Sequence, residues 1–187
     1  MKTVLFSFLL TTILLLAGCA DTSISPIESD SQSYQLIKLP PKSGLSVENI
    51  FSQTKLINGK IGGLIKIQER YVAANGNTVK IDAKLKVPNN AFVGNVNITI
   101  TIDDEYAAVS FSPEMVFDKP LRLDLKFTGI DLEELNLTSG NYDFVYIDDD
   151  GNTEMIQYDG IEVDELKGEI RVQKAYLNHF SRYCFTR

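Results

Sequence analysis

Apolar and polar residues alternate strictly over three stretches in the middle of the chain. The stretches cover residues 79–87, 96–102 and 121–127, and each carries an apolar residue at every second position. Lysine, arginine, aspartate, asparagine or threonine fills the positions between them. Because successive side chains of a β-strand point to opposite faces, this pattern predicts antiparallel strands with one buried face and one solvated face.

Weaker apolar runs add further strands to these three. They lie at 64–72, 107–111, 142–147, 154–158, 161–164, 169–177 and 180–186. Turn-forming residues separate the runs, as at Asn75-Gly76-Asn77, Pro88-Asn89-Asn90, Asp118-Lys119-Pro120 and Asp150-Gly151-Asn152. Many short strands with frequent turn signals are typical of a sandwich or barrel. We therefore predict an all-β fold, a single antiparallel β-sandwich of about eight to ten strands.

The remaining segments of the chain give less regular patterns. Residues 34–57 are mixed: a short strand is expected at 34–37, and 46–51 fits either a strand or a helical turn. The only helical candidate is 130–135, which reads IDLEEL. Order is expected to begin near Tyr34, so the predicted β-sandwich domain covers 34–187.

The first residues of the chain have the three parts of a secretory signal. Lys2 supplies a positive charge, residues 4–16 are an apolar run, and small residues precede Cys19. The run is too short for a transmembrane helix, which needs about 20 apolar residues. We predict a signal peptide over 1–18.

The tetrapeptide Leu16-Ala17-Gly18-Cys19 resembles the lipobox of bacterial lipoproteins. The resemblance implies that Cys19 becomes the acylated first residue of the mature chain and anchors it to a membrane. The alternative is an ordinary signal peptide with an incidental cysteine. Residues 19–33 are small, polar and acidic and predict a flexible stalk. Ala20, in place of an aspartate after the cysteine, favours the outer membrane if the organism has two membranes.

Charge and cysteine content narrow the possible partners. The chain has 25 acidic and 18 basic residues, a net charge of −7, and removing 1–18 takes away one more positive charge, that of Lys2. This acidic balance disfavours phosphate backbones, so we expect no nucleic-acid partner. If Cys19 carries lipid, Cys184 has no partner for a disulfide and is expected to be buried and inert.

Residues 58–123 are similar to a known β-sandwich domain. The similarity rests on Gly62-Gly63, Val87-Pro88-Asn89-Asn90-Ala91-Phe92, Phe111-Ser112-Pro113 and Phe117-Asp118-Lys119-Pro120-Leu121-Arg122-Leu123. This order of segments resembles the domain shared by zonula occludens proteins, netrin receptors and ankyrins. The resemblance implies a β-sandwich with an interaction role and no catalytic activity.

The sequence His179-Phe180-Ser181 resembles the site at which autoproteolytic members of that superfamily cut themselves. The resemblance implies His179 as the base, Ser181 as the nucleophile and Phe180 as the acyl side. The alternative is structural, with His179 and Ser181 on one face of a closing strand and Phe180 in the core. Cleavage would release only seven residues, so we favour the structural interpretation.

The acidic segment 148–152 allows two interpretations. Asp148, Asp150 and Asn152 have the spacing of the first calcium ligands of an EF-hand loop, but Thr153 replaces the glycine required at position 6. An Asp-Gly pair between two apolar runs is the usual sign of a β-hairpin turn. We favour the turn, with weak calcium binding as the alternative.

Catalytic motifs are otherwise scarce. The acidic groups at 103–105 and 131–134 are of the kind a glycosidase uses, but such loop residues are ordinarily just solvated. The chain has one histidine and no Gly-x-Ser-x-Gly motif, which disfavours a serine hydrolase. We expect a noncatalytic envelope lipoprotein without a cofactor that binds an unknown protein or glycan. An autoproteolytic module cut at Phe180–Ser181 and a cell-envelope hydrolase are the alternatives.

Overall fold

The structure of the protein is a computed structural model that describes residues 34–44, 51–132, 142–148 and 150–187. These residues belong to one compact unit, Ser33–Arg187. They form eleven β-strands and one short 3-10 helix, Glu165–Lys167, and contain no α-helix. The strands are β1 (Ser52–Asn58), β2 (Gly63–Val72), β3 (Thr78–Val87), β4 (Asn95–Ile102), β5 (Ala108–Ser112), β6 (Val116–Thr128), β7 (Asp143–Ile147), β8 (Thr153–Met155), β9 (Gly160–Asp164), β10 (Glu169–His179) and β11 (Arg182–Thr186).

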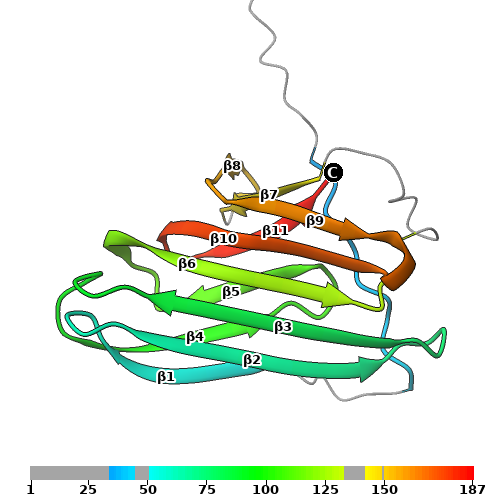
Figure 1. Ribbon diagram of the computed structural model, residues 1–187, viewed down its shortest axis with the longest axis horizontal. Coiled ribbons are helices and arrows are strands. Elements are labelled where there is room, and N and C mark those ends of the chain that lie inside the picture. The colour runs from blue at the N-terminus through cyan, green and yellow to red at the C-terminus, as the bar shows by residue number, and fades with distance from the viewer. Residues whose placement is uncertain (1–33, 45–50, 133–141, 149) are drawn as a thin grey trace, which may run out of the picture. The chain divides into compact units, whose positions relative to one another are not determined.

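The strands form two antiparallel sheets that pack face to face. One sheet has six strands in the order β1-β4-β5-β11-β7-β8, and the other has five in the order β2-β3-β6-β10-β9. In Figure 1 the five-stranded sheet lies in front and the six-stranded sheet behind it. The predicted β-sandwich is therefore confirmed.

The core lies between the sheets and follows the predicted alternation. Along β3, for example, Ile81 and Leu85 are at most 1 % exposed, and the lysines between the core positions are exposed. Opposite them on β6, Leu123, Leu125 and Phe127 are fully buried. Burying one such side chain stabilises the fold by about 1.5–3 kcal/mol. The three alternating stretches supply 12 of the 38 buried apolar residues that the structure describes.

The mixed segment at 34–57 contains a strand that the pattern did not predict. β1 pairs with β4 over its whole length, yet only Ile57 of its seven residues is buried, because β1 is an edge strand. Without a buried face, a strand leaves no alternation in the sequence. The expected strand at 34–37 is reduced to isolated bridges, such as that between Leu36 and Thr186.

One local prediction is wrong, and another lies partly outside the described residues. The turn predicted at Asp118-Lys119-Pro120 is wrong, because these residues lie within β6. The pairing with β10 is interrupted there, since Leu177 is opposite Leu121 but His179 is opposite Val116. A proline is tolerated at such an irregularity because no ladder hydrogen bond needs its missing N–H. Of the helical candidate 130–135, residues 133–135 lie outside the described part of the chain.

Candidate functional site

The His179-Phe180-Ser181 segment joins the two sheets. His179 ends β10 in the five-stranded sheet, and β11 of the six-stranded sheet begins at Arg182. The prediction that His179 and Ser181 share a face of one strand is therefore wrong, because the chain has to leave one sheet and enter the other between them. The predicted core position of Phe180 is confirmed: the residue is 3 % exposed.

Contacts around this crossover are those of a packed structural corner. The Phe180 ring stacks on Phe111 with 5.0 Å between ring centroids. The His179 ring lies edge-on to the Tyr146 ring, with 4.5 Å between ring centroids. The backbone carbonyl of His179 accepts a 2.6 Å hydrogen bond from the Tyr183 hydroxyl. Among the hydrogen bonds of the described residues, none joins the imidazole to the Ser181 hydroxyl. A general base needs that contact in the reacting geometry, so the crossover as observed favours packing over proton transfer.

Asp148, Gly151 and Asn152 lie in the turn of the β7–β8 hairpin. Ile147 pairs with Thr153, and one oxygen of the Asp148 carboxylate accepts a 2.7 Å hydrogen bond from the backbone N–H of Asn152. The other oxygen accepts a 2.8 Å bond from the Asn152 amide, and these bonds lower the pKa of Asp148. The part of the chain that is described holds no group of three or more His, Cys, Asp or Glu side chains placed to bind a metal ion. The hairpin accounts for this sequence without a metal.

The acidic group at 103–105 also organises local structure. One oxygen of the Asp103 carboxylate accepts hydrogen bonds from the backbone N–H groups of Glu105 and Tyr106, at 2.9 and 2.8 Å. The other oxygen lies 2.7 Å from the Arg182 guanidinium. Glu105 lies 3.4 Å from the Lys38 amine. Both carboxylates thus already have partners. Of the second acidic group, Glu133 and Glu134 lie outside the described residues.

The two cysteines are Cys184, in β11, and Cys19, in the N-terminal part of the chain. Cys184 is fully buried, and burial raises the pKa of its thiol to about 12, so the thiol is neutral near pH 7. Cys19, the expected lipidation site, lies outside the described residues. No helix within the described ranges is long and apolar enough to cross a membrane.

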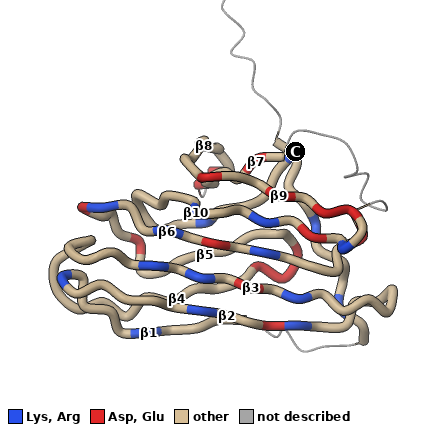
Figure 2. The backbone as a smooth tube through the Cα atoms, in the orientation of Figure 1, with Lys and Arg blue, Asp and Glu red and all other residues tan. Residues whose placement is uncertain are grey.

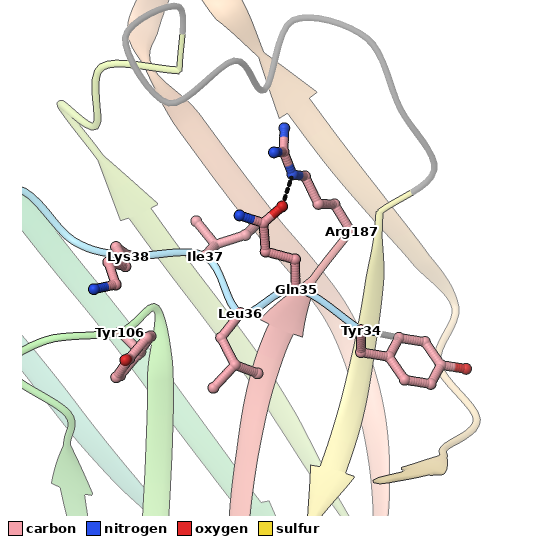
Figure 3. A pocket seen from close by; sticks show the side chains of 7 residues that line it. All are labelled: Tyr34, Gln35, Leu36, Ile37, Lys38, Tyr106 and Arg187. Carbon is pink, nitrogen blue, oxygen red and sulfur yellow. Dashed lines mark hydrogen bonds between the residues drawn. The ribbon is translucent and has the colours of Figure 1, made fainter. Parts of the chain in front are cut away.

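A hollow of about 380 Å³ marks the place where the described chain begins (Figure 3). Gln35 and Arg187 exchange two backbone hydrogen bonds of 3.0 Å beside it, and the Arg187 Nε donates to the Gln35 side-chain oxygen at 2.8 Å. The wall consists of Tyr34, Gln35, Leu36, Ile37, Lys38, Tyr106 and Arg187. This hollow is the seam between the start of the domain and its C-terminal residues.

The strongest candidate for a functional surface is a concentration of positive charge on the outside of the five-stranded sheet. Every second residue of β2, β3 and β6 points away from the core, and seven of these outward residues are basic. We call this surface the basic face: it comprises Lys66, Arg70, Lys80, Lys84, Lys86, Arg122 and Lys126. Two acidic residues, Asp82 and Asp124, lie among them. Figure 2 shows the basic positions on these strands and the acidic positions on β9.

The strand register places cations of the basic face directly opposite one another. Lys66 of β2 pairs with Lys84 of β3, and Arg70 pairs with Lys80. Lys86 of β3 pairs in the same way with Arg122 of β6. Directly opposed residues have Cβ atoms about 4.5–5.5 Å apart, and like charges at that separation destabilise a sheet. The fold thus carries three repulsive pairs on one surface.

Nearby acids neutralise only one side of this surface. Asp82 accepts a 2.8 Å hydrogen bond from Gln68 and lies 4.0 Å from the Lys126 amine. Lys126 in turn lies 3.8 Å from Glu169 of β10. The described ion pairs within 4.0 Å include none made by the five cations on β2 and β3. The five cations of the β2–β3 ribbon are therefore compensated only in part, by Asp124 opposite Lys84 in the register and by Asp82 on β3.

The outside of the other sheet differs in character. The outward residues of β1, β4 and β5 are mainly uncharged, as with Thr54 and Thr99, whose hydroxyl oxygens lie 2.7 Å apart. The two outer surfaces of the sandwich are thus chemically distinct. The net charge of −7 hides this segregation, which is why composition alone did not reveal the basic face.

A shallow hollow of about 340 Å³ crosses the middle of the basic face. It is lined by Lys66, Ile67, Gln68, Asp82, Ala83, Lys84, Asp124, Leu125, Lys126 and Arg171. Its charged side chains come from four neighbouring strands, β2, β3, β6 and β10. The arrangement can hold an anion by charge, and no nucleophile with an adjacent base is present in the lining.

Comparisons with models of protein families, with curated proteins and with solved structures give no match for this chain. The similarity to the domain of zonula occludens proteins, netrin receptors and ankyrins therefore stays a prediction.

Proposed function

We propose that the chain is a noncatalytic lipoprotein of the bacterial cell envelope, whose β-sandwich binds an anionic envelope component through the basic face. The observation that carries this proposal is the set of three directly opposed cation pairs. Such pairs weaken the sheet, and a bound anion would convert their repulsion into attraction. A bound anion would therefore stabilise the sheet at these pairs, which favours binding of an anion on this surface.

Edge protection does not explain the basic face. Lysines on an edge strand prevent sheets from pairing with other chains, and this accounts for Lys66 and Arg70 on the edge strand β2. β3 is not an edge strand, because it pairs with β2 on one side and β6 on the other. Edge protection therefore does not account for Lys80, Lys84 and Lys86. Their outward positions only require polar residues, and anion binding is the reason we propose for positive charge there.

Support for a noncatalytic role comes from the partners of the candidate catalytic groups. Asp103 is held by two backbone N–H groups and by Arg182, and His179 packs against Tyr146. These contacts give each group a structural task. Since the residues that the structure describes contain no reacting pair, the exposed positive charge is the chemical feature that best suits a binding partner.

Support for the location comes from the sequence. The signal over 1–18 and the lipobox-like Leu16-Ala17-Gly18-Cys19 direct export and acylation of Cys19. In an organism with two membranes, Ala20 after the cysteine favours the outer one. The acylated chain would hold the sandwich close to the polymers of the envelope, where weak binding by many charges is effective.

Anchoring is tested with the full chain produced in a bacterium. Wild-type protein is expected in the membrane fraction with acyl chains at Cys19, as measured by mass spectrometry. The Cys19→Ala variant is expected to lose the acyl mass. Recovery of an unmodified, soluble wild-type chain would contradict the lipoprotein assignment.

Binding is tested with the chain from Ala20 onward, which contains every described core residue. The double variant Lys66→Glu/Lys84→Glu changes the net charge by −4, and so does the control Lys60→Glu/Lys119→Glu, which alters exposed cations outside the basic face. Co-sedimentation with isolated envelope material should fall at least tenfold for the first variant only. An equal loss for both variants, or no loss for either, would contradict the proposed site.

A further inference from the structure

We infer that the basic face binds a linear polymer with one negative charge per repeat, lying along β2 and β3. This inference rests on the proposed function and names the class of ligand. It is carried by the spacing of the cations, by their residue types and by the acidic margin on the far side of the sheet.

The cations form two parallel rows. On β3, Lys84 and Lys86 are two residues apart, which is about 7 Å along an antiparallel strand. Lys80 lies about 14 Å beyond Lys84, and Asp82 stands between them in the same row. Lys66 and Arg70 of β2 run beside Lys84 and Lys80. The rows are about 5 Å apart across the strands. Together they make a positive track about 20 Å long, which suits an extended anion better than a compact one.

The residue types favour recognition of charge over recognition of shape. Four of the five cations on the track are lysines, and only Arg70 is an arginine. A lysine amine is a compact charge on a flexible stem, whereas a guanidinium imposes a planar, two-pronged geometry on its partner. Exposed lysines in rows can follow successive charges of a flexible chain without fixing the orientation of any one group.

Acidic residues limit where such a chain can lie. Glu162 and Asp164 of β9 and Glu169 of β10 border the basic face on the side away from β2. Arg171 of β10 is already paired with Glu162 at 3.5 Å. A polyanion is therefore repelled from β9 and β10 and held on the β2–β3 track.

The length of the track sets the size of the ligand. Outward positions of β3 are about 7 Å apart, and of the four from Lys80 to Lys86 three are cations and the fourth is Asp82. A ligand of about four charged repeats covers this distance and places about three of its charges beside a cation. Polymers of uronic acids and polymers of polyol phosphates both have this chemistry. Either can supply the ligand, since flexible lysine side chains can follow negative charges at different spacings and do not select the acid group.

The experiment measures binding of the chain from Ala20 onward by calorimetry. The probes are oligogalacturonates of two, four and eight residues, linear polyphosphates with the same numbers of charges, and neutral maltooctaose. Affinity should rise at least tenfold from two to four charges and little more from four to eight, with no binding of maltooctaose. Tighter binding of the uronate or of the phosphate series would identify the source of the ligand.

Variants and salt dependence connect this binding to the track. Lys66→Gln and Lys84→Gln should each weaken binding of the eight-residue probe several-fold, and Lys84→Arg should keep it, because the charge is retained. The logarithm of the affinity should fall linearly with the logarithm of the salt concentration, with a slope of about −3.5 for five contacts to a flexible chain.

Several results would overturn the inference. Equal affinity for two and eight charges, or affinity insensitive to salt, would indicate a discrete site. Binding to phosphatidylglycerol vesicles without binding to the polymers would make a lipid surface the partner, which contradicts the linear polymer but keeps the proposed anion-binding role. Tighter binding of a single-stranded octanucleotide than of any other probe would make nucleic acid the partner. Loss of envelope binding in the control variant as well would instead contradict the proposed function.

Discussion

The substitution Lys66→Glu should make the folded domain more stable while it removes binding. Lys66 lies on the edge strand β2, so its only directly opposed neighbour is Lys84. The two diagonal neighbours on β3 are Asp82 and Lys86, whose charges cancel. The substitution therefore changes one repulsive pair into one attractive pair and leaves the other interactions nearly balanced.

The size of the effect follows from Coulomb's law. Two unit charges about 6 Å apart in water interact by about 0.7 kcal/mol, and screening at 0.1 M salt reduces this to about 0.4 kcal/mol. Changing repulsion into attraction doubles the difference to about 0.8 kcal/mol, within the range measured for cross-strand pairs. For a domain of this size, that corresponds to a rise in Tm of about 2–3 °C.

Urea denaturation at low and high salt measures this prediction. The Lys66→Glu variant should gain about 0.8 kcal/mol at 0.1 M salt, Lys66→Gln should gain about half as much, and both gains should shrink at 1 M salt. The same Lys66→Glu protein should bind the envelope polymer at least tenfold more weakly. A loss of stability in this variant would refute the claim that the opposed lysines repel each other.

Three further predictions concern the core and the candidate catalytic groups. Phe180→Ala should lower the free energy of unfolding by about 3–5 kcal/mol in urea denaturation, because it empties a site in the aromatic core. Ser181→Ala should leave the stability nearly unchanged, and the chain should keep its single intact mass. Asp103→Ala should cost about 1–3 kcal/mol in the same assay, since Arg182 and two backbone N–H groups lose their acceptor. Cys184 should resist iodoacetamide at pH 8 in the folded protein and react in denaturant, because burial raises the pKa of its thiol from 9.0 to about 12. The stability that the buried neutral thiol contributes is complete below pH 9 and is lost as the pH rises toward 12.

Each of these results has a contrary outcome. Two masses that sum to the full chain, split at Phe180–Ser181, would make the crossover an autoproteolytic site. An Asp103→Ala protein as stable as wild type would show that its contacts with Arg182 add nothing. Rapid alkylation of Cys184 in the folded state would show an accessible thiol.

The sequence predicted the parts of the fold in which a strand has one buried face. β3, β4 and β6 follow the alternation of their apolar residues, because burial is what produces that pattern. β1 has almost no buried residues, so the same reasoning missed it. Pro120 led to the prediction of a turn, which is wrong. The irregular pairing that tolerates a proline inside β6 is made with β10, and the local sequence around Pro120 does not show it.

The basic face depends on information that a single strand does not contain. The alternating lysines of β3 were visible as outward positions, but Lys66 lies in a weaker run, and its pairing with Lys84 is set by the β2–β3 register. A shift of one residue would turn the β2 side chains to the opposite face and remove these pairs. Overall charge pointed the other way, since the acidic excess of the whole chain masks a local positive surface.

Nuclear magnetic resonance can show whether an anionic polymer contacts the basic face. The isotope-labelled chain from Ala20 onward is titrated with the eight-residue oligogalacturonate, and backbone amide shifts are followed residue by residue. If the polymer lies along β2 and β3, the largest changes fall on residues 64–70 and 80–86. Changes centred on the hollow at 34–38, on the crossover at 179–181 or on the uncharged face of β4 would contradict this placement.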